Sequence, residues 1–302
     1  MRTDSADAQA HRGTIFQEQA RVLDHHDAGA DQWILRLAAP ECARHAQPGQ
    51  FAHLQCDPRL PMRRPLSIQR VAPEAGWVEF LYKVVGDGTR VLAQRRTGET
   101  LSMLGPIGQP FRLHPERPQR LLLGGGVGIP PMIFLAHHLH LQGQAGQTRA
   151  VLGSEIPFPF HPRPSQILWP GLPDGAIATL PLLEDWGVAC RLTSKAGIAG
   201  AFDGFVTDLA RAWLGDLSPT ERGQVELFAC GPHPMLEACA ELAAEFDLPC
   251  QVSLEEFMAC AVGGCAGCTV PTRTPTGVAM KRICVDGPVF AASDVFPEPE
   301  RA

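Results

Sequence analysis

Four cysteines near the C-terminus constrain this chain more than any other feature of its sequence. Cys260, Cys265, Cys268 and Cys284 have the spacing C-x4-C-x2-C-x15-C. The first three reproduce the ligand run of plant-type [2Fe–2S] proteins. Small residues stand between them, so one loop can wrap a cluster and aim backbone N–H groups at its sulfur atoms. The spacing therefore predicts a [2Fe–2S] site, which Cys284 closes from a later strand.

Two other uses of these cysteines compete with the cluster. A structural zinc ion also takes four thiolates, but zinc sites usually combine two C-x2–4-C knuckles, and Cys284 has no close partner in the sequence. Inert buried thiols are the other alternative. Outside this cluster and Cys230, the cysteines are isolated and are interpreted as small buried apolar residues, at positions 42, 56, 190, 239 and 250.

Length and composition indicate two domains with a small appendage. The chain has 302 residues, 45% of them apolar and 19% charged, so it can bury a core. A net charge of −6 without a long basic run argues against nucleic acid as a partner. The polar segment 1–13 lacks the apolar stretch of a secretory signal. Ten cysteines without such a signal favour reduced thiols and a cytoplasmic location.

The order of the expected elements divides the chain into three parts. Short β segments broken by Gly and Pro predict an antiparallel β-barrel over residues 13–113. Strands alternating with helices predict a Rossmann-like parallel α/β domain over 118–248. Its strands are expected at 120–123, 150–152, 176–178 and 225–229, its helices at 131–142, 204–214 and 234–246, and an irregular proline-rich loop at 156–173. Residues 249–296 are predicted to be a metal-stapled appendage.

Two glycine-containing turns predict a dinucleotide site in the α/β domain. The uncharged stretch from Leu121 to Leu139 is better explained by a buried strand, turn and helix than by a membrane span, so no membrane contact is expected. Its turn allows a pyrophosphate to approach a helix N-terminus; the residues are Gly124, Gly125, Gly126 and Gly128. A second turn, Cys230, Gly231 and Pro232, also follows a strand. Cys230 is either a packing residue or a catalytic candidate that faces a nicotinamide.

The barrel carries signals of a second nucleotide. Arg64 lies in a predicted strand, where a guanidinium can clamp a diphosphate, and Ser67 follows three positions later. The turn at Gly88 and Thr89 precedes a short helix and offers a second anion cradle. Arg59, Arg63 and Arg64 form a local basic cluster, and a solvated basic face is its alternative interpretation.

Taken together, these motifs resemble the electron transfer subunits of two-component, NAD-linked dihydroorotate dehydrogenases, in the ferredoxin–NADP reductase superfamily. The resemblance runs from about residue 13 to residue 295. It is carried by the segments Arg64–Ser67, Leu81–Lys83, Gly88–Thr89, Gly124–Pro131, Cys230–Pro232, Ser253–Cys260 and Cys284–Phe290. Residues 153–200 fit the pattern poorly, and the first dozen residues look like an extension.

The resemblance implies the cofactors and the residues that hold them. FAD would be contacted by Arg64, Pro65, Leu66, Ser67, Leu81, Tyr82, Lys83, Gly88 and Thr89. The four cysteines would hold the [2Fe–2S] cluster, and NAD(H) would exchange at the α/β domain. Glu155, which follows the strand at 150–153, would repel a 2′-phosphate, which favours NAD(H) over NADP(H).

The resemblance also implies a role and a partner. The chain would be an oxidoreductase subunit that passes electrons between NAD and an FMN-containing catalytic subunit, in a two-plus-two heterotetramer serving pyrimidine biosynthesis. The base that acts on dihydroorotate would lie on that partner. Related subunits of bifurcating ferredoxin–NADP oxidoreductases, sulfide dehydrogenases or hydrogenases share the layout and are the first alternative. A zinc-stapled nucleotide-binding regulatory module is an alternative from another class.

Overall fold

Short alternating strands build the first part of the chain. The structure, a computed structural model, describes residues 13–296; the expected N-terminal extension lies outside the described residues. Leu35 and Leu37 alternate with more exposed neighbours, as in a strand with one face in a core. Six antiparallel strands close a barrel in the order β1-β2-β5-β4-β3-β6: Phe16–Gly29 (β1), Gln32–Ala38 (β2), Trp77–Lys83 (β5), Arg64–Ala72 (β4), Phe51–Leu54 (β3) and Thr100–Ile107 (β6).

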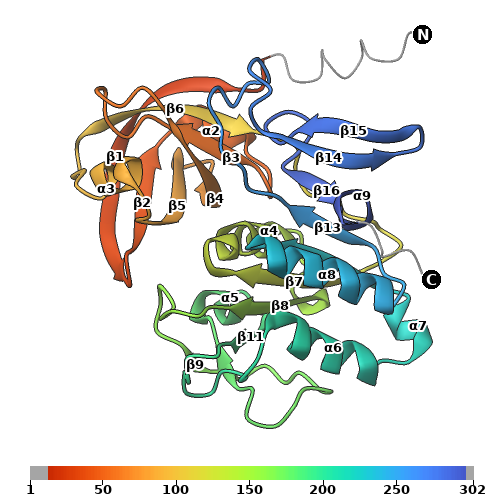
Figure 1. Cartoon of the computed structure of the whole chain (residues 1–302). Coiled ribbons are helices and arrows are strands. Elements are labelled where there is room, and N and C mark those ends of the chain that lie inside the picture. The colour runs from red at the N-terminus through yellow and green to blue at the C-terminus, as the bar shows by residue number, and fades with distance from the viewer. Residues whose placement is uncertain (1–12, 297–302) are drawn as a thin grey trace.

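The second part of the chain is built around a six-stranded sheet (Figure 1). Its first five strands are parallel, as the alternation of strands and helices predicts, and the last is antiparallel. In spatial order they are Ala189–Thr193 (β11), Thr148–Gly153 (β8), Gln119–Gly125 (β7), Val225–Cys230 (β12), Cys250–Ser253 (β13) and Val289–Ala291 (β16). Because the first five strands are parallel, their carboxyl ends lie at one edge of the sheet. Ligands of open α/β sheets bind at this edge.

Helices cover both faces of this sheet. Val206–Asp216 (α6) and His233–Glu245 (α8) contact each other and pack on one face, while Ile129–Leu141 (α4) packs on the other. Helix α4 also contacts barrel strand β4, so its residues 129–136 are buried on all sides, which explains why this part of the helix is apolar all round. Shorter helices are Pro40–His45 (α2), Asp87–Leu92 (α3), Pro181–Asp185 (α5), Pro219–Arg222 (α7) and Ala292–Val295 (α9), with 3-10 turns Gly126–Gly128 (η1) and Ala145–Gln147 (η2).

One expected strand lies elsewhere. The segment 176–178 is not a strand of the main sheet: Ala178–Thr179 (β10) pairs only with Arg163–Pro164 (β9), in a small antiparallel ribbon. The edge position beside β8 is taken instead by β11, which lies in the stretch that fits the family pattern poorly. The apolar run of β11 is interrupted by Arg191, whose guanidinium donates to the carbonyls of Cys190 and Ile167. An arginine inside a buried strand conceals the strand from pattern analysis.

The cysteine-rich segment is carried between two strands of the α/β sheet. Strand β13 precedes it and strand β16 follows it, and these two strands pair with each other. The segment itself contains the hairpin of Thr269–Thr274 (β14) and Gly277–Arg282 (β15), which lies beside the barrel in Figure 1. Gln109 donates to the carbonyl of Val285 at 3.1 Å and so ties the interdomain connection to this segment.

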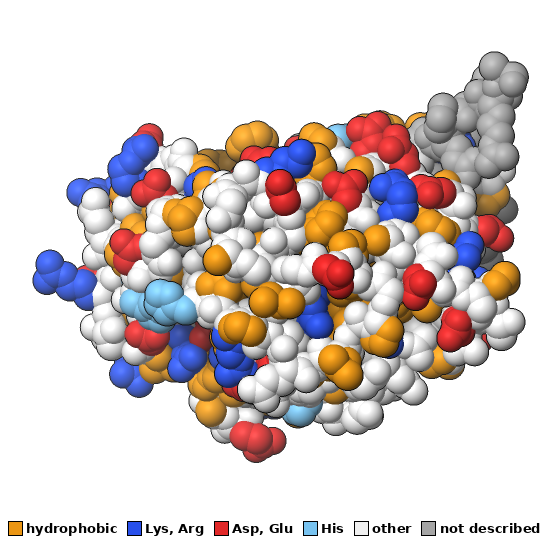
Figure 2. Space-filling view, turned by 90° about the horizontal axis from the view of Figure 1, so that it is seen from below, with side chains coloured by type: hydrophobic (Ala, Val, Ile, Leu, Met, Phe, Trp, Pro, Cys, Tyr) orange, Lys and Arg blue, Asp and Glu red, His pale blue; other side chains and the backbone are white. Residues whose placement is uncertain are grey.

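The surface of the α/β domain carries mixed charge. Figure 2 shows the molecule from below, with Lys and Arg side chains interspersed among Asp and Glu and no continuous basic patch on that face. Within residues 13–296, no helix combines the length and the apolar character needed to cross a membrane.

Candidate functional site

The barrel brings Arg64 and the Gly88 turn together. Arg64 begins β4, and Gly88 lies in the first turn of α3. A Cβ atom on Gly88 would collide with the Arg64 guanidinium, so the glycine is required for this close approach. A guanidinium beside the N-terminus of a helix forms a cradle that suits a diphosphate. The structure therefore brings together two predicted anion-binding elements that are 24 positions apart in the sequence.

Thr89 shapes the turn, and the other predicted flavin residues divide between two faces. The Thr89 hydroxyl accepts from the backbone N–H groups of Val85, at 3.0 Å, and Gly86, at 3.2 Å. Leu66 and Tyr82 pack in the barrel core, where the Tyr82 hydroxyl lies 2.9 Å from Nε2 of His25. Remaining members of the predicted set are the buried Leu81 and the partly buried Pro65, Ser67 and Lys83.

The two glycine turns of the α/β domain lie side by side. Gly124 and Cys230 are register partners on the neighbouring strands β7 and β12. A Cβ atom on Gly128 would overlap the Cys230 carbonyl, so only glycine allows the turns to approach this closely. Gly126 adopts a positive φ of 54° and has open space beside it. Pro130 and Pro131 in the first turn of α4 have no N–H group, so the donors for an anionic ligand at this edge are those of the glycine turn.

Cys230 lies at the centre of a small polar group. It is fully buried, and burial, followed by the nearby Glu255 carboxylate, raises the pKa of its thiol far above neutrality, while a hydrogen bond from Ser253 acts in the opposite direction. The thiol is therefore protonated at pH 7. Ser253 is the register partner of Cys230 on β13, and the exposed Glu255 follows two residues later. A thiol, a hydroxyl and a carboxylate thus meet at the carboxyl edge of the sheet.

Sequence reasoning missed Ser253 and Glu255 as members of this group. They lie 23 and 25 positions after Cys230, and only the pairing of β12 with β13 brings them together. Another neighbourhood that short-range patterns do not reveal is that of Glu155 and Lys195. The end of β11 lies beside the end of β8, since Ser154 N–H donates to the Thr193 carbonyl at 3.2 Å, so Lys195 and the predicted specificity residue Glu155 follow adjacent strands.

The four predicted cluster ligands form two pairs. The Sγ atoms of Cys268 and Cys284 are 3.4 Å apart, and both residues are buried. Cys260 and the exposed Cys265 form the second pair, and their side chains interact. Each iron of a four-cysteine [2Fe–2S] cluster takes two thiolates, so two pairs fit it.

Backbone N–H groups of the loop between the cysteines favour the thiolate form of Cys260. Burial raises the pKa of Cys260, but the backbone N–H groups of Val262, Cys265 and Gly264, together with the Cys265 side chain, outweigh burial and bring it to about 7. Backbone N–H groups aimed at sulfur are also what a sulfur-rich cluster needs around it. Ala261 and Ala266 adopt positive φ values of 56° and 52°, which wraps the loop tightly. The donor set and its surroundings therefore fit an iron–sulfur cluster.

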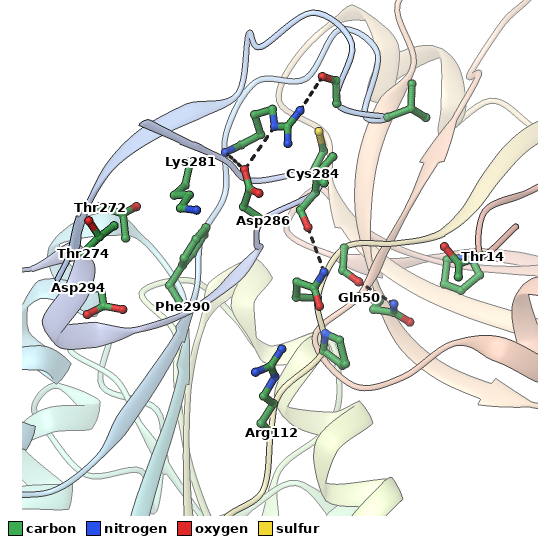
Figure 3. A pocket seen from close by; sticks show the side chains of 18 of the residues that line it. Thr14, Gln50, Arg112, Thr272, Thr274, Lys281, Cys284, Asp286, Phe290 and Asp294 are labelled. Atoms are coloured by element: carbon green, nitrogen blue, oxygen red, sulfur yellow. Dashed lines mark hydrogen bonds and ion pairs between the residues drawn. The ribbon is translucent and has the colours of Figure 1, made fainter. Parts of the chain in front are cut away.

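A separate cavity borders this segment on its barrel side (Figure 3). It has a volume of about 1260 Å³ and lies between the first barrel residues, the interdomain connection and the β14–β15 hairpin. Figure 3 shows Lys281, Asp286 and Arg112 around it, with Cys284 at its edge. None of the predicted FAD or NAD residues lines it, so this cavity is distinct from both predicted nucleotide sites.

Comparisons with known proteins identify the family. A barrel that presents an arginine–glycine cradle, followed by an α/β domain with paired glycine turns and a four-cysteine loop, defines an iron–sulfur flavoprotein reductase of the ferredoxin–NADP reductase type. The family model of the iron–sulfur cluster binding domain of dihydroorotate dehydrogenase B matches residues 255–296.

Curated relatives match almost the whole chain. The dihydroorotate dehydrogenase B (NAD+) electron transfer subunit of Geobacillus kaustophilus is 35% identical over 295 residues, 93% of this chain and 99% of the relative. That of Desulforamulus reducens is 31% identical over 283 residues, 92% of this chain and 98% of the relative. The chain therefore belongs to the family of dihydroorotate dehydrogenase B (NAD+) electron transfer subunits.

Solved structures agree with this fold. The structure described as an NADH-dependent reduced ferredoxin–NADP oxidoreductase, a flavin-based bifurcating protein, superposes with a TM-score of 0.73 at 26% identity, over 92% of this chain and 90% of that one. A ferredoxin–NADP+ reductase of Neisseria gonorrhoeae with bound FAD and NADP superposes with a TM-score of 0.54 at 14% identity, over 78% of this chain and 92% of that one. The second likeness concerns the fold alone. The predicted barrel, α/β domain and iron–sulfur segment are confirmed.

Proposed function

We propose that this chain is the electron transfer subunit of a dihydroorotate dehydrogenase of the NAD-linked type. It would pass electrons between a catalytic flavoprotein partner and NAD, in the cytoplasm, for pyrimidine biosynthesis. The observation that carries the proposal is that the candidate flavin, nucleotide and cluster sites lie on one chain, with the last two directly connected. The polar edge at Cys230 and Ser253 leads through Glu255 directly into the loop that begins at Cys260.

The barrel residues divide the work of holding FAD. Arg64 and the α3 N-terminus at Gly88 and Thr89 would bind the diphosphate, because guanidinium and helix N–H groups both favour an anion. Pro65 and Ser67, which alternate with the buried Leu66, would meet the ring system on the outer face of β4. The inward Leu66 and Tyr82 would support the site from the core, and Leu81 and Lys83 would contribute from β5.

The glycine edge would bind NAD(H). Backbone N–H groups of Gly124, Gly125, Gly126 and Gly128 would approach the pyrophosphate, and Gly231 and Pro232 would hold the nicotinamide end. The protonated Cys230 and Ser253 give this end polar groups without charge. Bound FAD supplies the conversion between hydride transfer at nicotinamide and single-electron transfer at the cluster. The cysteines at 260, 265, 268 and 284 would hold that cluster.

The partner would be an FMN-containing catalytic subunit, in a two-plus-two assembly. Support comes from the family, whose members are called electron transfer subunits. The exposed Cys265 places one ligand of the proposed cluster at the surface, where a partner can approach. We also propose the division into a flavin domain at 13–113, a nucleotide domain at 118–248 and a cluster segment at 249–296, with β13 and β16 anchoring that segment in the sheet.

The reconstituted complex tests this proposal. The isolated chain, loaded with FAD and cluster, should reduce a dye with NADH but leave dihydroorotate unchanged, because none of the motifs found in it supplies the base that dihydroorotate oxidation requires. With the catalytic subunit added, dihydroorotate should reduce NAD+. A Cys265→Ser variant should retain dye reduction and lose the coupled reaction. Dihydroorotate oxidation by the isolated chain, or coupling by the variant, would contradict the relay.

A related reductase with another partner is the second candidate. It is favoured by the superposition with the NADH-dependent reduced ferredoxin–NADP oxidoreductase. Purification of the tagged chain from its own cells separates the two candidates. A dihydroorotate-oxidising subunit in the isolated complex supports the first proposal, and a different flavoprotein subunit supports the second.

A further inference from the structure

Arg70 is a partly buried arginine to which the proposed function assigns no role. It lies on β4, three residues after Ser67, and its side chain is 27% exposed. Its Nε atom is buried and has no hydrogen-bond partner within residues 13–296. A long arginine side chain can usually carry its guanidinium out to water. A guanidinium that stays under cover therefore needs an explanation from its surroundings.

The barrel holds the Arg70 guanidinium from one side. Arg70 is the register partner of Glu79 on β5, and its Nη1 atom lies 3.6 Å from Oε1 of this buried carboxylate. The Cζ atom of Arg70 lies 5.6 Å from the ring centroid of Trp77, within the range of a cation–π contact. Arg36 donates to Glu79 at 2.6 and 3.1 Å. Because Arg36 already pairs with Glu79, Arg70 is available for a further contact.

The other side of the guanidinium meets the α/β domain. The Arg70 Cζ atom lies 5.9 Å from the ring centroid of Trp186, which directly follows α5. Trp186 is in turn fixed to α4. Its ring stacks on His137 with the centroids 4.6 Å apart, and Nδ1 of His140 donates to its carbonyl at 2.9 Å. Arg70 therefore stands between a tryptophan of the barrel and a tryptophan of the α/β domain.

The two elements that this contact connects each carry a proposed site at one end. Strand β4 begins with the flavin residues 64–67, and α4 begins directly after the glycine turn 126–128. Phe134 of α4 packs with residues of the barrel core, and the two elements lie side by side (Figure 1). A helix that rests on a barrel can still rock about such a contact. The contact at Trp186 lies outside α4 and therefore opposes the rocking.

A second interdomain contact lies at the opposite end of β5. Trp77 is the first residue of this strand, and Lys83, the register partner of Gln32, is the last. The Gln32 side chain donates to the Pro157 carbonyl of the α/β domain at 2.8 Å. A strand of seven residues spans about 20 Å. The α/β domain is thus held near both ends of β5, and loss of the Arg70 contact would release one of them.

We propose that Arg70 is a positioning residue whose guanidinium, held between Trp77 and Trp186, fixes the α/β domain against flavin strand β4 and so sets the approach of the nicotinamide to the flavin. This inference rests on the proposed function. Hydride transfer requires the reacting atoms at about 3–3.5 Å, and a small misplacement caused by a distant change lowers the rate strongly. Arg70 would act through the orientation of the two domains and would touch neither nucleotide.

Rapid mixing of the FAD-loaded full chain with saturating NADH tests the positioning role. Arg70→Met keeps the stem and removes the charge, Trp186→Leu removes the ring face, and Trp186→Phe keeps an aromatic face. Arg70→Met and Trp186→Leu should each slow flavin reduction about three- to tenfold, while the Kd for NADH stays unchanged because the glycine turns are intact. The double variant should be no slower than the slower single variant, because both changes break the same contact. Trp186→Phe should recover most of the rate.

Hydrogen–deuterium exchange provides a measurement that does not depend on activity. The amides of residues 183–188, around Trp186, should exchange about two- to fivefold faster in Arg70→Met, the loss expected for one partly exposed cation–π contact. Arg211→Met, at an exposed ion pair with Glu245 inside the α/β domain, is the matched control and should equal the wild type in both measurements. Single-variant effects that multiply in the double variant, a Trp186→Phe rate as low as that of Trp186→Leu, or wild-type exchange in Arg70→Met would overturn the inference.

Failure of the proposed function would give a different result. A wild-type chain that lacks FAD, or whose flavin is not reduced by NADH, would overturn the proposed function. The exchange comparison would still decide whether Arg70 holds Trp186, because both groups belong to the protein. If Arg70→Met aggregates, Arg70→Gln, which is also uncharged, takes its place in both measurements.

Discussion

Cys265 is the predicted cluster ligand whose removal is least damaging to the rest of the fold. It is exposed, whereas Cys268 and Cys284 are buried. We expect Cys265→Ser to lose the iron–sulfur spectrum and to retain FAD, because the flavin residues lie in the barrel. Iron and flavin analysis of the purified variant checks this. Cys239→Ala, a change at an isolated buried cysteine on α8, is the control and should keep both.

Glu155 is a single residue whose carboxylate is expected to set the preference for NAD(H) over NADP(H). It is exposed just beyond β8, where the ribose of a bound dinucleotide would lie. Glu155→Gln should raise kcat/KM for NADPH relative to NADH by about fivefold, since an exposed charge contributes about 1 kcal/mol. Dye reduction with each nucleotide measures this ratio. Glu245→Gln, at an exposed ion pair on α8, should leave the ratio unchanged, and an unchanged ratio in Glu155→Gln would refute the assignment.

At the scale of elements, the fit between β4 and α3 depends on Gly88. A Cβ atom there would push the Arg64 guanidinium away from the α3 N-terminus. Gly88→Ala should therefore weaken FAD retention while the barrel keeps its stability, because the displaced atoms are the far end of a flexible side chain that can move aside. Gly86→Ala, two residues earlier with open space around it, should retain FAD. Flavin content after gel filtration and thermal unfolding together decide the matter.

The junction of β7 and β12 offers a second test at this scale. Gly128 touches the Cys230 carbonyl so closely that an added Cβ would force the two turns apart. Gly128→Ala should raise the KM for NADH severalfold while FAD stays bound, because the flavin site lies in the other domain. Gly146→Ala, which meets open space in the same domain, is the control. Equal KM values in both variants would mean that the turns do not form the nucleotide site.

Local patterns predicted some elements and missed others for physical reasons. The cysteine spacing, both glycine turns and helices α4, α6 and α8 follow from short-range sequence signals. Strand β11 was missed because Arg191 interrupts its apolar run. The Arg191 guanidinium can be buried there because it donates hydrogen bonds to backbone carbonyls. Ser253 and Glu255 joined Cys230 only through the pairing of β13 with β12. Long-range pairing of this kind leaves no signal within one segment.

In the whole molecule, the cluster segment is fixed to both domains. Its flanking strands β13 and β16 belong to the α/β sheet, and Gln109, from the connection between the domains, donates to the Val285 carbonyl. A segment held from two sides can keep its ligands in register while it presents Cys265 to a partner. The order of the sites along the chain therefore serves a relay between separate centres.

Analysis of the anaerobically purified chain tests the central claim most directly. One sample should yield FAD, iron and acid-labile sulfide, with two irons and two sulfides for each flavin, and an absorption spectrum that combines flavin and [2Fe–2S] bands. The bands of both groups should bleach on addition of NADH. Zinc in place of iron and sulfide, with no visible absorption, would contradict the account and would identify the chain as a zinc-stapled nucleotide-binding module.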